Sequence, residues 1–160
     1  ALTEPGSGSD AASLKTTAIK DGTDYVLNGT KRYITNAPEA GIFTVMARSD
    51  PKTPGSKGIS AFIVERDTPG LSIGKQDKKM GQQGTHTADV IFENCRVPIN
   101  NRIGVEGQGF KTAMKVLDRG RLRIAGMSVG AAERLIEECI GYAKERVQFN
   151  KPLAEFQLIE

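Results

Sequence analysis

The sequence predicts an α+β protein, with an antiparallel β-sandwich or barrel-like domain over residues 1–100 and long α-helices over residues 101–160. Between residues 13 and 98, short alternating apolar runs are separated by turn signals roughly every 8–12 residues, which is typical of sandwiches and barrels. Beyond residue 100 the apolar period becomes helical. Residues 122–132 are apolar or small on nearly every side, as in a buried helix. One helix cannot bury such a surface alone, so partner helices are expected from elsewhere in the protein or from another subunit.

The β-domain is expected to consist of strands joined by tight turns. The dipeptides Asp21-Gly22 and Asn28-Gly29 favour the positive φ angles that hairpins require. The composition of residues 50–57 indicates an exposed loop. The expected strands cover residues 14–20, 25–27, 30–35, 41–48, 58–65, 88–92 and 95–97.

Two helices are expected after a glycine-rich loop at residues 104–109. The first is indicated by apolar residues with i, i+3, i+4, i+7 spacing, namely Phe110, Ala113, Met114 and Leu117. Asp118 is expected to cap a second helix whose body runs to about Arg146. Lys151-Pro152 is a suitable terminator for that helix, because proline cannot continue the hydrogen-bond ladder.

The composition is that of a globular protein, with 38% apolar and 26% charged residues. A net charge of +3 and the absence of tryptophan give no indication of a nucleic-acid partner. No apolar run approaches the roughly 20 residues that span a bilayer, so no membrane partner is expected. The two cysteines, Cys95 and Cys139, lack metal-site spacing and are expected to be buried thiols. With His86 as the only histidine, no metal site is predicted.

Two motifs in the β part could hold a flat polar ligand. Residues 2–9 (LTEPGSGS) force an irregular backbone, which leaves N–H and C=O groups for a ligand, and they add short hydroxyls. Tyr33 and Thr35, two residues apart, would share one face of a strand and could flank a ring system. The alternatives are an ordinary Gly/Ser loop and a strand that simply ends at Asn36.

Two further motifs lie in the helical part. Residues 118–123 (DRGRLR) place three arginines at an expected helix start, either as a solvated face or with an anionic partner. Residues 145–153 (ERVQFNKPL) close the helical stretch. An arginine near the negative end of the helix dipole is the ordinary interpretation of Arg146.

In order and spacing, these four motifs resemble those of the acyl-CoA dehydrogenase family over essentially the whole chain, the last as R-x-x-F-x-x-P-L. Residues 79–84 and 92–98 resemble architectural blocks of the same family. The resemblance implies that residues 1–100 are the middle β-domain and residues 101–160 the start of the C-terminal helical domain. It also implies helices before and after these residues.

The resemblance implies FAD as cofactor and no metal. The Thr35 hydroxyl would reach flavin N5, the atom that accepts hydride. The residues from Arg146 onward would contact the FAD of a neighbouring subunit. The residues that match the family's flavin contacts are Ala1, Leu2, Thr3, Glu4, Gly8, Ser9, Tyr33, Ile34, Thr35, Arg146, Gln148 and Phe149.

The resemblance also implies an acyl-CoA substrate, bound by Ser9, Asp118, Arg119, Gly120 and Arg121. Some family members carry the catalytic glutamate at the position of Gly120. The base is therefore expected beyond residue 160, no catalytic residue is assigned here, and residues 1–160 alone are expected to be inactive. Residues 117–122 resemble short-chain and branched short-chain members.

The implied reaction is α,β-dehydrogenation in fatty-acid β-oxidation, with electrons passing to an electron-transfer flavoprotein. A homo-oligomer, tetramer or dimer, is implied, in the cytoplasm of a bacterium or the mitochondrial matrix of a eukaryote. Two alternatives stay open. One is a related flavin oxidase or monooxygenase on the same scaffold, and the other is a non-enzymatic β-sandwich binding module.

Overall fold

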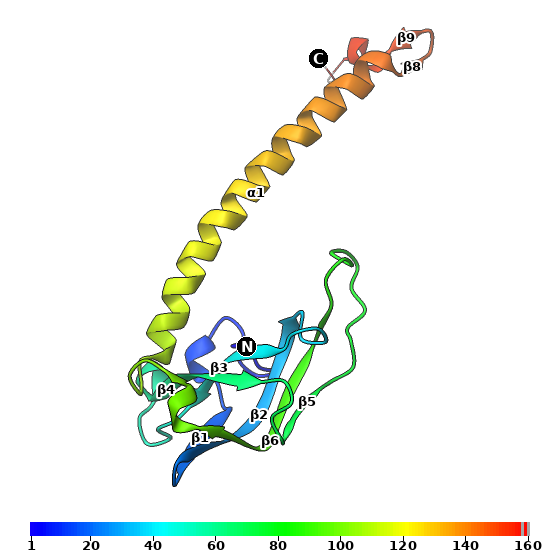
Figure 1. Ribbon diagram of the computed structural model, residues 1–160. Helices are drawn as coiled ribbons and strands as arrows, with labels where there is room; N and C mark the ends of the chain where they lie inside the picture. Colours follow the sequence, from blue (N-terminus) through cyan, green and yellow to red (C-terminus); the bar gives the residue numbers. More distant parts are fainter. Residues whose placement is uncertain (158, 160) are drawn as a thin grey trace. The chain divides into compact units, whose positions relative to one another are not determined.

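The computed structural model of the protein describes residues 1–157 and residue 159. The chain forms two compact units, Ala1–Lys115 and Val116–Glu160. The first unit is built round a seven-stranded sheet, and the long helix α1 (Gly109–Glu145) begins in the first unit and makes up most of the second (Figure 1). The predicted α+β fold class is confirmed.

The sheet of the first unit has the strand order β5-β6-β2-β1-β3-β4-β7. Neighbouring strands are antiparallel except β1 and β3, which meet in parallel where Thr17 lies opposite Arg48. The sheet is therefore mixed, and the predicted antiparallel arrangement is wrong for this one pair. The strands are β1 (Thr17–Asp21), β2 (Asp24–Thr35), β3 (Ile42–Arg48), β4 (Ile59–Glu65), β5 (Leu71–Ile73), β6 (Thr87–Pro98) and β7 (Arg102–Ile103). Short 3₁₀ turns occupy Ala11–Ser13, Gly55–Gly58, Ile99–Asn101 and Leu153–Glu155.

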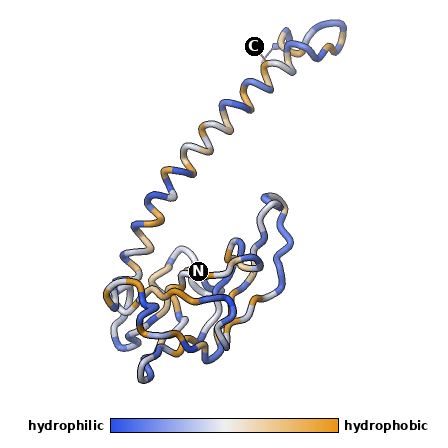
Figure 2. The backbone as a smooth tube through the Cα atoms, in the orientation of Figure 1, coloured by the Kyte–Doolittle hydropathy of each residue, from blue (hydrophilic) through white to orange (hydrophobic). Residues whose placement is uncertain are grey.

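Apolar side chains from the strands form the core of the first unit, and Figure 2 shows the apolar stretches of the chain that carry them. The rings of Tyr25 and Phe62 meet edge to face with centroids 4.9 Å apart. The first turn of α1 closes one side of the core, where Ala113 is buried with Leu14. A Cβ on Gly109 would lie 2.4 Å from the carbonyl carbon of Ser60, so the helix can start this close to β4 only with glycine.

One of the two predicted hairpin turns is confirmed and the other is wrong. Asp21-Gly22 joins β1 to β2 antiparallel, with Gly22 at a φ of 60°. Asn28-Gly29 lies inside β2, where the register with β6 shifts. A Cβ on Gly29 would lie 2.5 Å from Thr16 Oγ1, so glycine is required by close packing of the backbone against Thr16.

The two predicted helices are one. Asp118 lies inside α1 and does not cap a second helix, because nothing interrupts the backbone hydrogen bonds and a single glycine such as Gly120 costs a helix only about 1 kcal/mol. The helix ends at Glu145, next to the predicted Arg146. Lys151-Pro152 does not terminate the helix; it forms β9 (Lys151–Pro152), which pairs with β8 (Val147–Gln148).

In the second unit, apolar residues recur along α1 (Figure 2), and the large ones among them are exposed. Leu122 is 77% exposed and Met127 69%. Burial of this surface by partner helices therefore stays a prediction. Cys95 is buried as predicted, whereas Cys139, which lies on this helix, is exposed. No helix among residues 1–157 and 159 is long and apolar enough to cross a membrane.

Candidate functional site

The amino-terminal segment 1–4 uses every one of its carbonyl groups within the protein and leaves two consecutive amides free. The N–H groups of Leu2 and Thr3 have no hydrogen-bond partner among the described residues. An unpaired N–H needs an acceptor when it is removed from water, so this pair can bind an electron-rich edge of a ligand. The carbonyl oxygens accept hydrogen bonds from Met46 N to Ala1 (3.1 Å), Lys31 Nζ to Leu2 (3.1 Å), Arg32 N to Thr3 (2.8 Å) and Ser7 N to Glu4 (3.1 Å).

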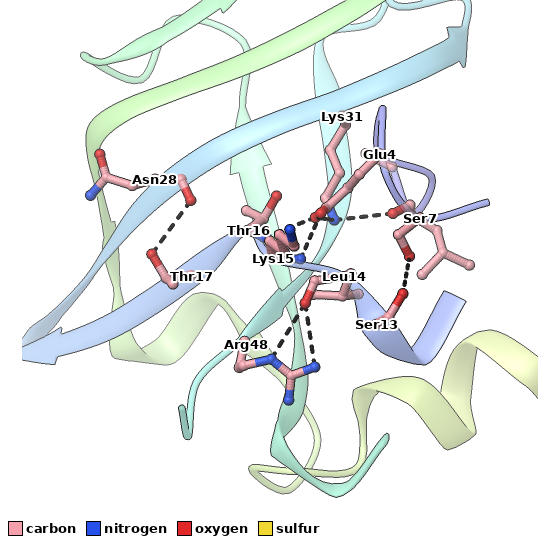
Figure 3. Close-up of polar contacts among 12 residues, drawn as sticks. Glu4, Ser7, Ser13, Leu14, Lys15, Thr16, Thr17, Asn28, Lys31 and Arg48 are labelled. Carbon is pink, nitrogen blue, oxygen red and sulfur yellow. Dashed lines mark hydrogen bonds and ion pairs between the residues drawn. The ribbon is translucent and has the colours of Figure 1, made fainter. Parts of the chain in front are cut away.

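A buried ion pair lies directly behind this segment (Figure 3). Lys31 is completely buried, and its Nζ lies 2.8 Å from Oε1 of Glu4, which is 7% exposed. The Glu4 carboxylate also accepts hydrogen bonds from the amides of Lys15 (2.6 Å) and Thr16 (2.9 Å). Because both oxygens have protein donors, the Glu4 side chain holds the segment to β2 and to the residues that lead into β1, and it is not free to act as a base.

The ionisation of this pair is set by burial and hydrogen bonding. Burial alone would raise the pKa of Glu4, but the hydrogen bonds from Lys15, Lys31 and Thr16 outweigh it and hold that pKa below its ordinary value. Burial lowers the pKa of Lys31, and the Glu4 carboxylate opposes this shift. Glu4 is consequently a fixed carboxylate at neutral pH.

The turn that follows is closed by serine hydroxyls (Figure 3). Ser7 is buried and its Oγ donates to the carbonyl of Asp10 at 2.7 Å, while the Ser13 hydroxyl donates to the same carbonyl at 2.8 Å. Gly8 and Ser9 lie at the exposed tip. Of the predicted binding residues in this turn, Gly8 and Ser9 are therefore the ones that a ligand can reach.

The second predicted motif forms a bulge at the end of β2. Tyr33 has a φ of 58° and is 63% exposed, and the register with β6 shifts between Lys31 and Ile34. Ile34 packs against the core and Thr35 is exposed. Tyr33 and Thr35 thus both face outward. Simple strand alternation does not explain this, because it would place Lys31 on the same face, and Lys31 is buried.

The structure brings these first two motifs together. The hydrogen bond from Arg32 N to Thr3 O places the free amides beside the Tyr33 bulge. The Arg32 guanidinium lies 4.3 Å from the Tyr33 ring centroid and forms ion pairs of 2.8 Å with Asp77 and Asp89. A donor pair, an exposed aromatic ring and an exposed hydroxyl therefore share one edge of the first unit.

The remaining predicted residues all belong to the second unit. Asp118, Arg119 and Arg121 are exposed on α1, with Gly120 between them, and the Arg121 guanidinium pairs with Asp118 at 2.5 Å. Beyond the helix lie the other predicted flavin contacts, Arg146, Gln148 and Phe149. Phe149 is 88% exposed.

An apolar pocket is formed within the second unit beside Phe149. Its lining includes Cys139, Tyr142, Leu153 and Phe156, and the ring of Phe149 meets that of Phe156 edge to face.

Sequence reasoning missed the charged residues that shape the first unit. Lys31 and Arg32 were seen only as part of a motif, and Arg48 was not singled out. The Arg48 guanidinium donates to the carbonyls of Ala12, Leu14, Thr53 and Gly55, and so joins two loops. A lone cation at the end of an otherwise mostly apolar strand is the signal that could have found Arg48, whereas Lys31 lies beside Arg32 in a more polar strand and gives no such signal.

Two family models match the chain. The model described as "Acyl-CoA dehydrogenase, middle domain" matches residues 1–95, and "Acyl-CoA dehydrogenase, C-terminal domain" matches residues 107–160. The chain therefore belongs to the acyl-CoA dehydrogenase family.

Relatives of known name include enzymes of both oxidation and reduction. The mitochondrial isobutyryl-CoA dehydrogenase of Bos taurus is 52% identical over 99% of this chain, and the acryloyl-CoA reductase (NADH) of Anaerotignum propionicum is 51% identical over 100% of it. The subunit CarC of the caffeyl-CoA reductase-Etf complex of Acetobacterium woodii is 49% identical over 99%. The chain spans 38%, 41% and 42% of these three proteins, respectively.

A solved structure supports the same relationship. An acyl-CoA dehydrogenase from Bacillus anthracis, complexed with FAD, superposes with a TM-score of 0.91 at 45% sequence identity. The match covers 99% of this chain and 27% of that chain.

Proposed function

We propose that the protein is an FAD-dependent acyl-CoA dehydrogenase in which these residues bind the flavin and part of the CoA thioester. The observation that carries the proposal is the pair of free amides at Leu2 and Thr3, locked beside the exposed Tyr33 and Thr35. Family membership and the FAD complex of a relative support it.

The residues present fit a flavin. An isoalloxazine has a flat ring face and an edge of carbonyl and ring-nitrogen acceptors. The Leu2 and Thr3 amides are donors for such an edge, and the exposed Tyr33 ring offers an aromatic face. The cofactor, when bound, supplies a hydride acceptor. The Thr35 hydroxyl would serve as a donor toward N5, where such a donor stabilises the negative charge of the reduced ring.

The second unit would contribute to the CoA site. The cations of Arg119 and Arg121 suit an anionic ligand, with Asp118 beside them on α1. In the first unit, the exposed Ser9 is proposed separately as a polar contact of the acyl-CoA. Gly120 offers no carboxylate, so a glutamate beyond residue 160 would remove the α proton. Arg146, Gln148 and Phe149 would contact the FAD of a neighbouring subunit, in a tetramer or dimer.

The direction of the reaction would depend on the electron partner. The names of the relatives include a dehydrogenase, a reductase and a subunit of a reductase-Etf complex. We propose an electron-transfer flavoprotein as partner and a short or branched short acyl chain as substrate. The site of action would be the bacterial cytoplasm or the mitochondrial matrix.

The test is anaerobic reduction of the longest natural chain that contains these residues. The purified protein is expected to be yellow, and butyryl-CoA or isobutyryl-CoA should bleach its visible flavin band. A protein that neither contains FAD nor binds added FAD would overturn the proposal. Rapid reoxidation of the reduced flavin by oxygen would favour an oxidase, and residues 1–160 alone should show no turnover.

A further inference from the structure

We propose that the buried Lys31–Glu4 pair is a positioning device that aims the Thr3 amide at the flavin. This inference rests on the proposed function, because it assumes that the Leu2 and Thr3 amides bind a flavin. The side chains of Lys31 and Glu4 are buried and would not touch the flavin themselves. Lys31 and Glu4 are accordingly positioning residues.

The argument begins with the geometry of one peptide unit. In a trans peptide the C=O of one residue and the N–H of the next point in opposite directions. The ammonium of Lys31 holds the Leu2 carbonyl from the interior at 3.1 Å, so the Thr3 N–H of the same peptide unit must point outward. Lys31 thus fixes the direction of an amide that it does not touch.

The Lys31 ammonium also bonds to Glu4, the residue that follows Thr3. Its second hydrogen bond, of 2.8 Å, goes to Oε1 of Glu4. The Glu4 carboxylate is itself held by the amides of Lys15 and Thr16. One cation therefore clamps the residues on both sides of Thr3, and the clamp is anchored to the chain that leads into β1.

The neighbouring amide is aimed in the same way by backbone alone. The Ala1 carbonyl accepts from Met46 N at 3.1 Å, which turns the Leu2 N–H outward. The Leu2 carbonyl, by contrast, accepts its hydrogen bond from a side chain, that of Lys31 on β2. Burying an ammonium is costly unless it is paired, and this accounts for the carboxylate of Glu4 beside it.

The test compares three variants of the natural holoprotein. Lys31→Met removes the donor to the Leu2 carbonyl and leaves the Glu4 carboxylate without its counter-ion. Lys31→Met combined with Glu4→Gln removes both charges but still leaves the Leu2 carbonyl without its donor. Val97→Ala, at a buried position in β6 opposite Tyr25 of β2, is the control for loss of stability alone. The readouts are the FAD dissociation constant of the apoprotein, the visible circular dichroism of bound flavin, and the melting temperature.

We expect Lys31→Met to raise the FAD dissociation constant by about tenfold and to change the flavin dichroism, beyond any effect of Val97→Ala. The double variant should recover much of the melting temperature while FAD binding stays weak. If affinity recovers together with stability, or follows stability in all three variants, the pair is merely structural and the inference is wrong. If the wild-type protein binds no FAD, the proposed function itself fails, and the flavin role of the pair fails with it.

Discussion

The amino-terminal segment of the first unit and the helix of the second differ in how many of their interactions are made within the chain. In residues 1–16, the Glu4 carboxylate, the carbonyls of residues 1–4 and the hydroxyls of Ser7 and Ser13 have partners within the chain, whereas the adjacent amides of Leu2 and Thr3 and the buried Thr16 hydroxyl have none among the described residues. Along residues 116–145, many large apolar side chains lie exposed. The candidate site of the first unit is therefore held by contacts within that unit, whereas burial of the helix in the second unit stays a prediction.

This difference predicts where the loss of a charge lowers the free energy of unfolding most. Glu4→Gln leaves Lys31 buried and unpaired, so we expect a loss of about 3–5 kcal/mol in the free energy of unfolding at neutral pH. Glu138→Gln is the matched control, because Glu138 pairs with Arg134 on the exposed helix and should cost less than about 0.5 kcal/mol. Urea denaturation of the natural protein measures both, and equal losses would contradict the comparison.

The same variant gives a pH signature. The pKa of Glu4 in the folded protein lies below the ordinary 4.5, so its charge stabilises the fold above that pH. This contribution is lost as the pH falls through the folded pKa. The difference in unfolding free energy between wild type and Glu4→Gln should therefore shrink in acid, and a constant difference would show that the carboxylate charge is not the cause.

The next largest effect concerns backbone packing in the first unit. Gly29→Ala would place a Cβ 2.5 Å from Thr16 Oγ1 and 2.7 Å from Thr16 Cα, so we expect a loss of about 3 kcal/mol. Gly22→Ala is the control, since its Cβ would meet nothing and its positive φ alone costs about 1 kcal/mol. If thermal or urea unfolding shows equal losses, φ rather than close contact governs Gly29.

These contrasts also show which parts of the structure a sequence can predict. The turn at Asp21-Gly22, the change of period after residue 100 and the helix end near Arg146 were predicted because each depends on neighbouring residues. The role of Gly29 was missed because it is set by Thr16, which lies just before β1. An Asn-Gly dipeptide has the same local chemistry in a hairpin and in a bulge.

The candidate site divides in the same way. Its exposed members, Ser9, Tyr33 and Thr35, could be predicted from motif and spacing. The clamp between Lys31 and Glu4 could not, because the two residues are 27 positions apart and a lysine in a strand gives no sign that it is buried. Long-range ion pairs are specified by the tertiary fold, which no local pattern encodes.

The smallest stability effect is expected at Asp118, and it tests the second unit. As an interior helix residue with an exposed i,i+3 partner in Arg121, Asp118 should change the unfolding free energy by less than about 0.5 kcal/mol when replaced by alanine. A helix N-cap would cost about 1 kcal/mol or more, so a loss of that size would contradict one continuous helix.

A substitution at Asp118 can distinguish an effect on folding from an effect on substrate binding in the intact protein. If it contacts the CoA thioester as proposed, Asp118→Ala should raise the KM for butyryl-CoA by about tenfold while the melting temperature hardly moves. Glu137→Ala is the matched control, because Glu137 makes a similar exposed i,i+3 pair with Arg134 further along α1 and has no assigned role in binding. Equal KM values in the two variants would remove Asp118 from the substrate site, leaving its pair with Arg121 as an ordinary surface contact on the helix.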